Sequence, residues 1–234
     1  MEISKRKSDR EVRNGQSVTL YKLPKIQTTI KNQELVQKRR EQIALAAIRV
    51  FSKKGFHKAT LRDLSKEVGI SHGNIYDYVG SKEDIFFLIH QFVADDIDSK
   101  LNDVVRSIEA PLEKLRQMVR CEFNFISQWE DAILLLYQEG HVLGKVYLHN
   151  FLKRERDHVS KYEAVLEECI ERNVLRPCNI RVIANFIKVM IDSLALKRWD
   201  LRGHGSYSEI EEYFLDFMFN GLMSRRRTEV NVSD

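Results

Sequence analysis

Apolar residues recur every three or four positions along most of this chain, in segments that end at glycine, proline or a hydroxyl residue. The first long segment, residues 34–54, keeps this spacing through Leu35, Ile43, Ala46, Ala47, Val50 and Phe51, and Gly55 follows it. A glycine directly after an apolar helical stripe is a common helix end. Because runs of alternating β-branched residues are few, the pattern predicts an all-α protein.

Two very short helical patterns follow, each opened by a hydroxyl residue. Thr60 precedes the first, and Asp63 stands where it completes a capping box. Gly69 separates the two patterns, and Ser71 opens the second, which spans about residues 72–79 and is polar on one side. This order is typical of a helix-turn-helix, whose second helix enters the major groove of DNA.

Longer helical segments make up the rest of the chain. Ser81 and Asp84 open one that keeps the helical period up to Ala110, so it extends from the helix-turn-helix into the region that follows. We expect the later helices at about residues 111–128, 129–139, 145–172, 178–199 and 207–223. The predicted fold is therefore a three-helix DNA-binding domain followed by a larger α-helical domain, with about nine helices in all.

The last two of these helices are apolar on more than one side. The off-stripe apolar residues of both are Val182, Phe186, Val189, Leu196, Leu215 and Phe219. Such a helix has to be buried on more than one side. We expect the two helices to pair with the same two helices of a second copy, which gives a homodimer through a four-helix interface. The alternative is burial inside one monomer.

Charge is unevenly distributed and defines the remaining segments. Residues 1–40 contain 11 Lys or Arg and only four Asp or Glu, whereas the rest of the chain has a slight acidic excess. A basic front end suggests a polyanionic partner, although a solvated tail is the alternative for the first 30 residues. We divide the chain into a basic arm (1–32), a helix-turn-helix domain (33–81), a second helical domain (82–224) and a tail (225–234).

The cysteine content and the apolar runs of the chain also bear on its cellular location. Cys121, Cys169 and Cys178 are odd in number and form no CxxC motif, which argues against a disulfide framework or a zinc ribbon. No signal peptide is apparent, and no apolar run approaches the roughly 18 residues of a membrane helix. We therefore expect a cytoplasmic protein that does not contact the membrane.

Residues 43–89, IALAAIRVFSKKGFHKATLRDLSKEVGISHGNIYDYVGSKEDIFFLI, resemble the DNA-binding domain of TetR-family transcriptional regulators. The match includes an Ala-Ala pair, a threonine before the second helix, a V-G-I-S turn and a G-x-I-Y-x-Y-x-x-S-K-E-D block. Val79 departs from the family, which usually has Phe at that position. The resemblance covers only this domain. It implies a homodimeric repressor that binds a palindromic double-stranded DNA operator. A small-molecule effector binds the second domain and releases the repressor from this operator.

The resemblance also assigns roles in DNA binding. It implies phosphate contacts by Thr60, Tyr76 and Lys82 and base contacts by His72, Gly73, Asn74 and Asp77, with Ser71 capping the recognition helix. An extended cap of a short helix is the alternative for Gly73 and Asn74. At the arm junction, Lys38, Arg39 and Arg40 are expected to reach the adjacent minor groove.

The effector site has to be inferred from weaker signals. We assign it to an aromatic-rich set across residues 111–151, namely Phe123, Trp129, Tyr137, His141, Tyr147 and Phe151, although ordinary core is an equal interpretation. The C-terminal segment is similar to family members that respond to acyl-CoA thioesters, and Arg198 is a candidate for binding CoA phosphates. A hydrophobic or cationic drug-like effector is the alternative.

Two other classes of protein, a metal-dependent enzyme and a nucleic-acid-binding protein without a ligand, fit the sequence less well. Glu155 and His158 form the E-x-x-H of a di-iron helical bundle, but no other histidine has a Glu three residues before it. HExxH, GxSxG and GxxxxGK[ST] are absent from the sequence, so we expect neither an enzyme, nor a metal site, nor a cofactor. A nucleoid-type or RNA-binding protein without a ligand would leave more than half of the chain unused.

Overall fold

The computed structural model of the chain describes residues 26–223. Most of the expected arm and all of the expected tail lie outside the described residues. Within them the protein is built from α-helices, with one isolated bridge between Leu175 and Met223 in place of any sheet. The all-α prediction is confirmed. None of the described helices is both long enough and apolar enough to cross a membrane.

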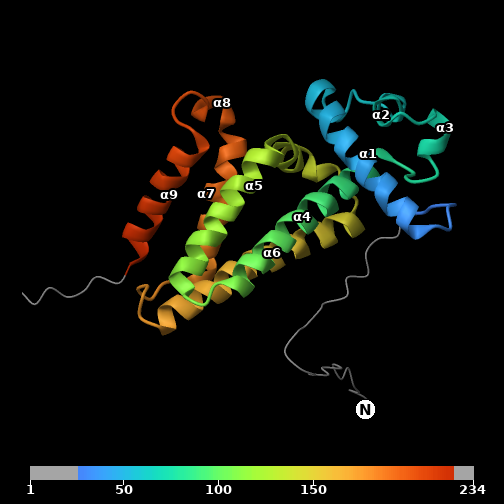
Figure 1. Cartoon of the computed structure of the whole chain (residues 1–234). Helices are drawn as coiled ribbons and strands as arrows, with labels where there is room; N and C mark the ends of the chain where they lie inside the picture. The colour runs from blue at the N-terminus through green and yellow to red at the C-terminus, as the bar shows by residue number, and fades with distance from the viewer. Residues whose placement is uncertain (1–25, 224–234) are drawn as a thin grey trace, which may run out of the picture.

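The first three helices form a helix-turn-helix unit at one end of the molecule (Figure 1). They are α1 (Gln33–Lys54), α2 (Leu61–Val68) and α3 (His72–Ile75). Thr60 and Asp63 form the expected capping box, and Gly69 adopts the left-handed conformation with φ 78° between α2 and α3. Local capping and turn chemistry therefore fixes this unit, as predicted.

Helix α3 is shorter than expected. It ends at Ile75 because the next amide groups bond three residues back: Tyr76 N–H donates to Gly73 O, and Asp77 N–H donates to Asn74 O. Residues 76–78 consequently form turns. The predicted helix over 72–79 is one helical turn followed by this tighter segment.

Residues 26–32 pack against the helix-turn-helix unit. Ile26 is buried in the core, and the hydroxyl of Thr28 donates to the carbonyl of Asp77 over 2.6 Å. The hydroxyl of Thr29 donates to the Asp77 carboxylate over 3.2 Å. This part of the expected arm therefore belongs to the folded domain, because one buried apolar side chain and two threonine hydrogen bonds hold it there.

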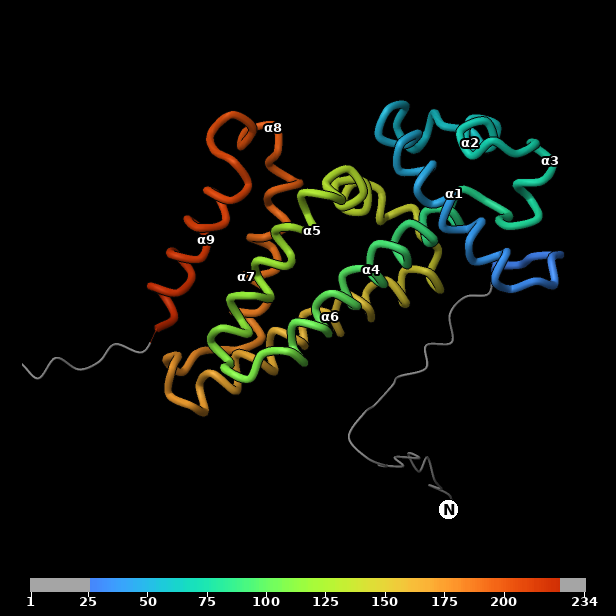
Figure 2. The backbone as a smooth tube through the Cα atoms, viewed as in Figure 1, coloured from blue at the N-terminus to red at the C-terminus, as the bar shows by residue number. Residues whose placement is uncertain are grey.

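Helices α4 (Lys82–Ser107) and α5 (Pro111–Glu139) carry the fold from the helix-turn-helix into the second domain. The sequence predicted a helix boundary at Trp129. The structure instead has one helix with a kink there, since Trp129 has φ −116° and ψ 18°. Figure 2 shows the tube of α5 changing direction near its C-terminal end. The Trp129 indole donates to Asp96 of α4 over 3.0 Å, which holds the kink against that helix.

The second domain is completed by α6 (Lys145–Glu171), α7 (Ile180–Leu196), α8 (Arg198–Leu201) and α9 (Tyr207–Leu222). A short 3-10 helix, η1 (Gly140–Val142), joins α5 to α6. Helix α8 was not predicted as a separate element, because the break is a single non-helical residue, Lys197, with φ −107° and ψ 14°. Helices α4, α5, α6 and α7 surround the core, and α9 packs on α5 (Figure 1).

Helices α7 and α9 each present apolar residues to the outside. Phe186 of α7 is 59% exposed, and Tyr213 and Phe217 of α9 are 76% and 68% exposed. The opposite faces of the same helices are buried, with Ile187 and Leu215 each 1% exposed. The prediction that both helices are apolar on more than one side is confirmed, and one side remains uncovered in the monomer.

Candidate functional site

The recognition helix α3 leaves its polar side chains on the surface. His72, Gly73 and Asn74 are exposed, and the rings of His72 and Tyr76 meet edge to face at 5.4 Å. Ser71 caps the helix by accepting from Asn74 N–H over 3.1 Å. Ile75 is fully buried and anchors the helix to the core. His72, Gly73 and Asn74, which are predicted to read bases, therefore lie on one short, exposed turn. The fourth predicted residue, Asp77, is half-buried, and its carboxylate accepts from the Thr29 hydroxyl.

Two residues predicted to contact phosphates are already hydrogen-bonded within the protein. The hydroxyl and backbone N–H of Thr60 both donate to the Asp63 carboxylate. The ammonium group of Lys82 donates to the carbonyls of Phe56, His57 and Ala59 over 2.8–3.2 Å. Lys82 therefore ties the turn after α1 to the start of α4, and its role in phosphate binding stays a prediction.

The three basic residues expected at the arm junction lie inside α1. Lys38 is exposed, and Arg39 bonds to Gln42. Arg40 instead donates to the carbonyls of Tyr78 and Ile26 over 3.0 and 2.8 Å. Its guanidinium is thus not free to reach a minor groove in this conformation, because it holds residues 26–27 against the helix-turn-helix.

A cavity of about 300 Å³ lies between α5, α6 and α7 in the second domain. Its apolar wall consists of Ile133, Leu136, Leu148 and Phe151, and its polar wall consists of Tyr137, His141, Glu155 and Lys188. A mostly apolar hollow with a few converging polar groups is typical of a small-molecule site. This cavity is the candidate effector site.

The polar wall is held by a buried ion pair on α7. The Lys188 ammonium donates to both oxygens of Asp192 over 2.6 Å, and the Tyr137 hydroxyl donates to Asp192 over 2.6 Å. Burial lowers the pKa of Lys188, but the adjacent Asp192 and the carboxylates of Glu122 and Glu155 outweigh burial and raise it. Lys188 is therefore a fixed positive charge at the cavity wall.

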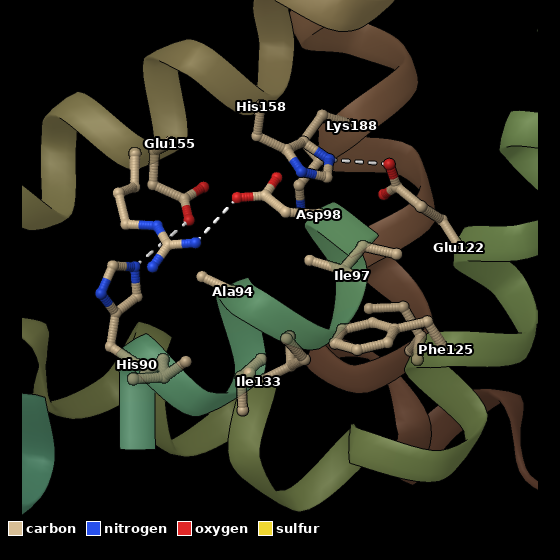
Figure 3. A pocket seen from close by; sticks show the side chains of 14 residues that line it. His90, Ala94, Ile97, Asp98, Glu122, Phe125, Ile133, Glu155, His158 and Lys188 are labelled. Atoms are coloured by element: carbon tan, nitrogen blue, oxygen red, sulfur yellow. Dashed lines mark hydrogen bonds and ion pairs between the residues drawn. The ribbon is translucent and has the colours of Figure 1, made fainter. Parts of the chain in front are cut away.

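A smaller hollow of about 50 Å³ lies on the other side of Lys188 and Glu155. Figure 3 shows it lined by side chains of α4, α5, α6 and α7, with His158 facing Glu122 and His90 facing Glu155. His158 Nε2 is 2.7 Å from Glu122 Oε1, and His90 Nε2 is 3.8 Å from Glu155 Oε1. The partners of the E-x-x-H residues thus come from α4 and α5, which no local motif could indicate.

The predicted effector residues separate into groups. Tyr137, His141 and Phe151 line the 300 Å³ cavity, as expected. Phe123 packs on Phe214 of α9 at 5.2 Å, and Trp129 packs on Phe92 at the kink. Arg198 is engaged by acidic residues, with Asp131 at 2.5 Å. Sequence reasoning missed Lys188, for which the available signal was a Lys and an Asp four residues apart in a mostly apolar helix.

Tyr147 lies at the junction of the two domains. Its hydroxyl donates to Asp84, which caps α4, and its ring packs on Phe87 at 4.6 Å. Burial raises the pKa of Tyr147, and the hydrogen bond to Asp84 raises it further. The stretch of chain from the end of α5 to the start of α6 also contains Gly140, His141 and Leu148, which line the cavity. One short segment, residues 139–148, therefore borders the cavity and contacts the start of α4, where Asp84 also accepts from the backbone N–H of Gly80 at the end of the helix-turn-helix domain.

The chain matches two family models. Residues 43–89 match the model of bacterial regulatory proteins of the tetR family, and residues 109–222 match the tetracyclin repressor-like C-terminal domain. Together the two models span most of the chain.

Similar proteins agree with this assignment. The HTH-type transcriptional regulator HbdR of Aromatoleum sp. (strain CIB) is 26% identical over 207 residues, covering 87% of this chain and 89% of HbdR. The ketosteroid regulator KstR2 of Mycobacterium tuberculosis has the same fold, with a TM-score of 0.68, 20% identity and coverage of 86% of this chain and 100% of that chain. AibR in complex with isovaleryl coenzyme A and operator DNA gives a TM-score of 0.69 at 18% identity, covering 77% and 98%. The helix-turn-helix, the helical second domain and these matches show that the chain belongs to the TetR family of DNA-binding transcriptional regulators.

Proposed function

We propose that this regulator is a repressor that binds a palindromic operator as a homodimer and is released by a small molecule. The observation that carries the proposal is the segment 139–148, which borders the 300 Å³ cavity and also reaches the helix-turn-helix domain. Glu139 faces His57 at 3.3 Å, and Tyr147 bonds to Asp84 at the start of α4, whose carboxylate also accepts from Gly80 N–H. A ligand that displaces this segment shifts the helix-turn-helix relative to the dimer axis. TetR-type control requires such a link between two distinct sites.

The exposed apolar faces of α7 and α9 support the homodimer. Phe186, Tyr213 and Phe217 are large side chains that a second copy would cover. A two-fold axis uses the same patch on both copies and holds two recognition helices at a fixed separation. A palindromic operator has half-sites about one DNA turn apart, roughly 34–36 Å, which a two-fold dimer matches.

We propose an acyl-CoA thioester as the effector. The cavity combines an apolar wall, suited to an acyl chain, with the Lys188 ammonium, which has a third N–H for a carbonyl besides the two bonded to Asp192. The Tyr137 hydroxyl donates its one proton to Asp192 and so fixes the polar wall. The complex of AibR with isovaleryl coenzyme A provides a precedent in a protein of the same fold. Arg198 contributes to CoA binding only if its ion pairs with Asp131 and Glu130 open.

The effector class is tested with operator DNA selected from a random-sequence pool by the full chain. Fluorescence anisotropy then follows release by acyl-CoA thioesters, by the matching free acids, by CoA and by cationic dyes. We expect release by thioesters and not by the free acids. Release by the free acids or the dyes alone would exclude a thioester effector.

A cavity-filling variant connects release to the proposed site. Leu148→Trp places a larger side chain in the cavity, and Leu148 is already 36% exposed, so the fold tolerates the change. We expect normal operator binding without release by thioesters. Leu152→Trp is the matched control, because Leu152 is on the same helix, is 57% exposed and does not line the cavity. Equal release from both variants would show that the effector binds elsewhere.

A further inference from the structure

Three potential metal ligands from the two domains meet where α5 ends. His57 lies in the turn after α1, Glu139 is the last residue of α5, and His141 lies in η1. One ligand atom from each of the three lies within 4.8 Å of the other two. The three residues are separated by up to 84 positions in the sequence, and only the fold brings them together.

The geometry is close to that of a zinc site. His57 Nε2 and Glu139 Oε2 are 3.3 Å apart. Two ligands of a tetrahedral zinc ion at the usual bond lengths of about 2.0–2.2 Å are separated by roughly 3.3–3.5 Å. The pair therefore already has the spacing of two ligands on one ion, and the exposed His141 offers a ring nitrogen within 4.8 Å of a ligand atom of each.

The surroundings orient the three ligands. His141 Nδ1 lies 3.2 Å from the carbonyl of Gln138, and since a carbonyl only accepts, Nδ1 carries the proton and Nε2 keeps its lone pair. This arrangement is the usual second contact of a metal-binding histidine. The Lys82 ammonium holds the carbonyl of His57. Glu139 Oε2 is buried and accepts no hydrogen bond in the described part of the chain, and His57 Nε2 faces it at 3.3 Å. A cation bound between these two atoms would satisfy the buried oxygen.

We propose that His57, Glu139 and His141 bind a divalent zinc ion that fastens the helix-turn-helix domain to the end of α5. Two imidazoles and one carboxylate are a common zinc ligand set, and water would fill the fourth position. His57 moves with the recognition helix, whereas Glu139 and His141 belong to the segment that borders the effector cavity. The ion therefore acts as a second input that restricts the same domain movement, and it does not depend on the identity of the effector.

The proposal is tested by titrating zinc into the full chain after treatment with a chelator, using isothermal titration calorimetry. We expect one zinc ion per chain. His57→Ala, His141→Ala and Glu139→Gln should each weaken binding by more than about 100-fold, beyond the loss typical of changes around the ligands. His57 and His141 are exposed, so their substitution should leave the fold intact. Circular dichroism checks the fold of all three variants.

Two matched controls distinguish this site from other zinc ligands. His204→Ala removes an exposed histidine elsewhere, and Cys178→Ser removes a partly exposed thiol. Both should bind zinc as the unchanged protein does. The proposal is overturned if the unchanged protein takes up no zinc, if His57→Ala binds zinc normally, or if Cys178→Ser alone abolishes binding.

Discussion

Arg39 and Arg40 are neighbours in α1 with different surroundings. Arg40 donates to main-chain carbonyls of Ile26, Gln27 and Tyr78, and burial lowers its pKa, whereas Arg39 bonds to the side chain of Gln42. Arg40→Ala leaves these carbonyls without their donor and should destabilise the protein by about 1–3 kcal/mol in urea unfolding. Arg39→Ala should cost less than about 0.5 kcal/mol. Equal losses would mean that Arg40 does not hold residues 26–29.

The buried pair of Glu122 and His158 makes stability depend on pH. Burial alone would raise the pKa of Glu122, but the His158 ring at 2.7 Å outweighs burial and lowers it. A lowered folded-state pKa contributes stability above the ordinary value of 4.5, and this contribution disappears as the pH falls through the folded value.

Glu122→Gln tests this dependence. The variant should be less stable than the unchanged protein by about 1–3 kcal/mol at neutral pH. The difference should shrink as the pH is lowered below 4.5, because the unchanged protein then loses the same charge. Urea unfolding at several pH values measures it. A difference that stays constant down to acid pH would contradict the pKa shift of Glu122.

Sequence signals that act within a few residues were sufficient for local structure. Thr60 with Asp63 and Ser81 with Asp84 form capping boxes that their spacing predicts. The partners of Lys82 lie 23–26 residues away, and those of Lys188 include residues of other helices. Such partners depend on how the helices pack, so the roles of these two lysines appear only in the structure.

The segment of residues 139–148 is the element that connects the two domains. Tyr147→Phe removes its hydrogen bond to Asp84 and keeps the ring packed on Phe87. We expect unchanged affinity for the effector, but release from the operator weakened several-fold, a coupling loss of roughly 1 kcal/mol. Calorimetry measures effector binding, and anisotropy measures release.

His149→Ala is the control for this segment, because His149 is exposed on the same helix two residues further on. It should behave as the unchanged protein does. If Tyr147→Phe also releases normally, the signal does not pass through Asp84.

The sequence predicted helix boundaries well where a capping side chain or a glycine ends the helix. It predicted them less well where tertiary contacts decide. The break at Trp129 was expected from the pattern, but whether it divides two helices or bends one depends on contacts such as the indole bond to Asp96. The effector residues show the same limit. An aromatic side chain has the same helical spacing in a core as in a cavity, so Phe123 and Phe151 were assigned together although only Phe151 lines the cavity.

At the scale of the whole molecule, the exposed faces of α7 and α9 define the proposed homodimer. Phe186→Glu with Phe217→Glu places two charges on this face, where both side chains are more than half exposed in the monomer. We expect a folded monomer in analytical ultracentrifugation and a loss of operator affinity of about 100-fold or more, because the two half-sites are then bound independently. Leu152→Glu, a comparable change on α6, should leave a dimer. A dimeric double variant would place the interface elsewhere.

In the proposed mechanism, effector binding changes the distance between the two recognition helices of the dimer. Pulsed electron resonance measures this distance with a spin label at Lys66→Cys, an exposed position on α2, in a chain whose three native cysteines are replaced. The dimer on operator DNA should give one narrow distance distribution, and saturating acyl-CoA thioester should displace it by a few ångström as the DNA is released. An unchanged distance distribution at a thioester concentration that empties the operator would contradict release by movement of the recognition helices.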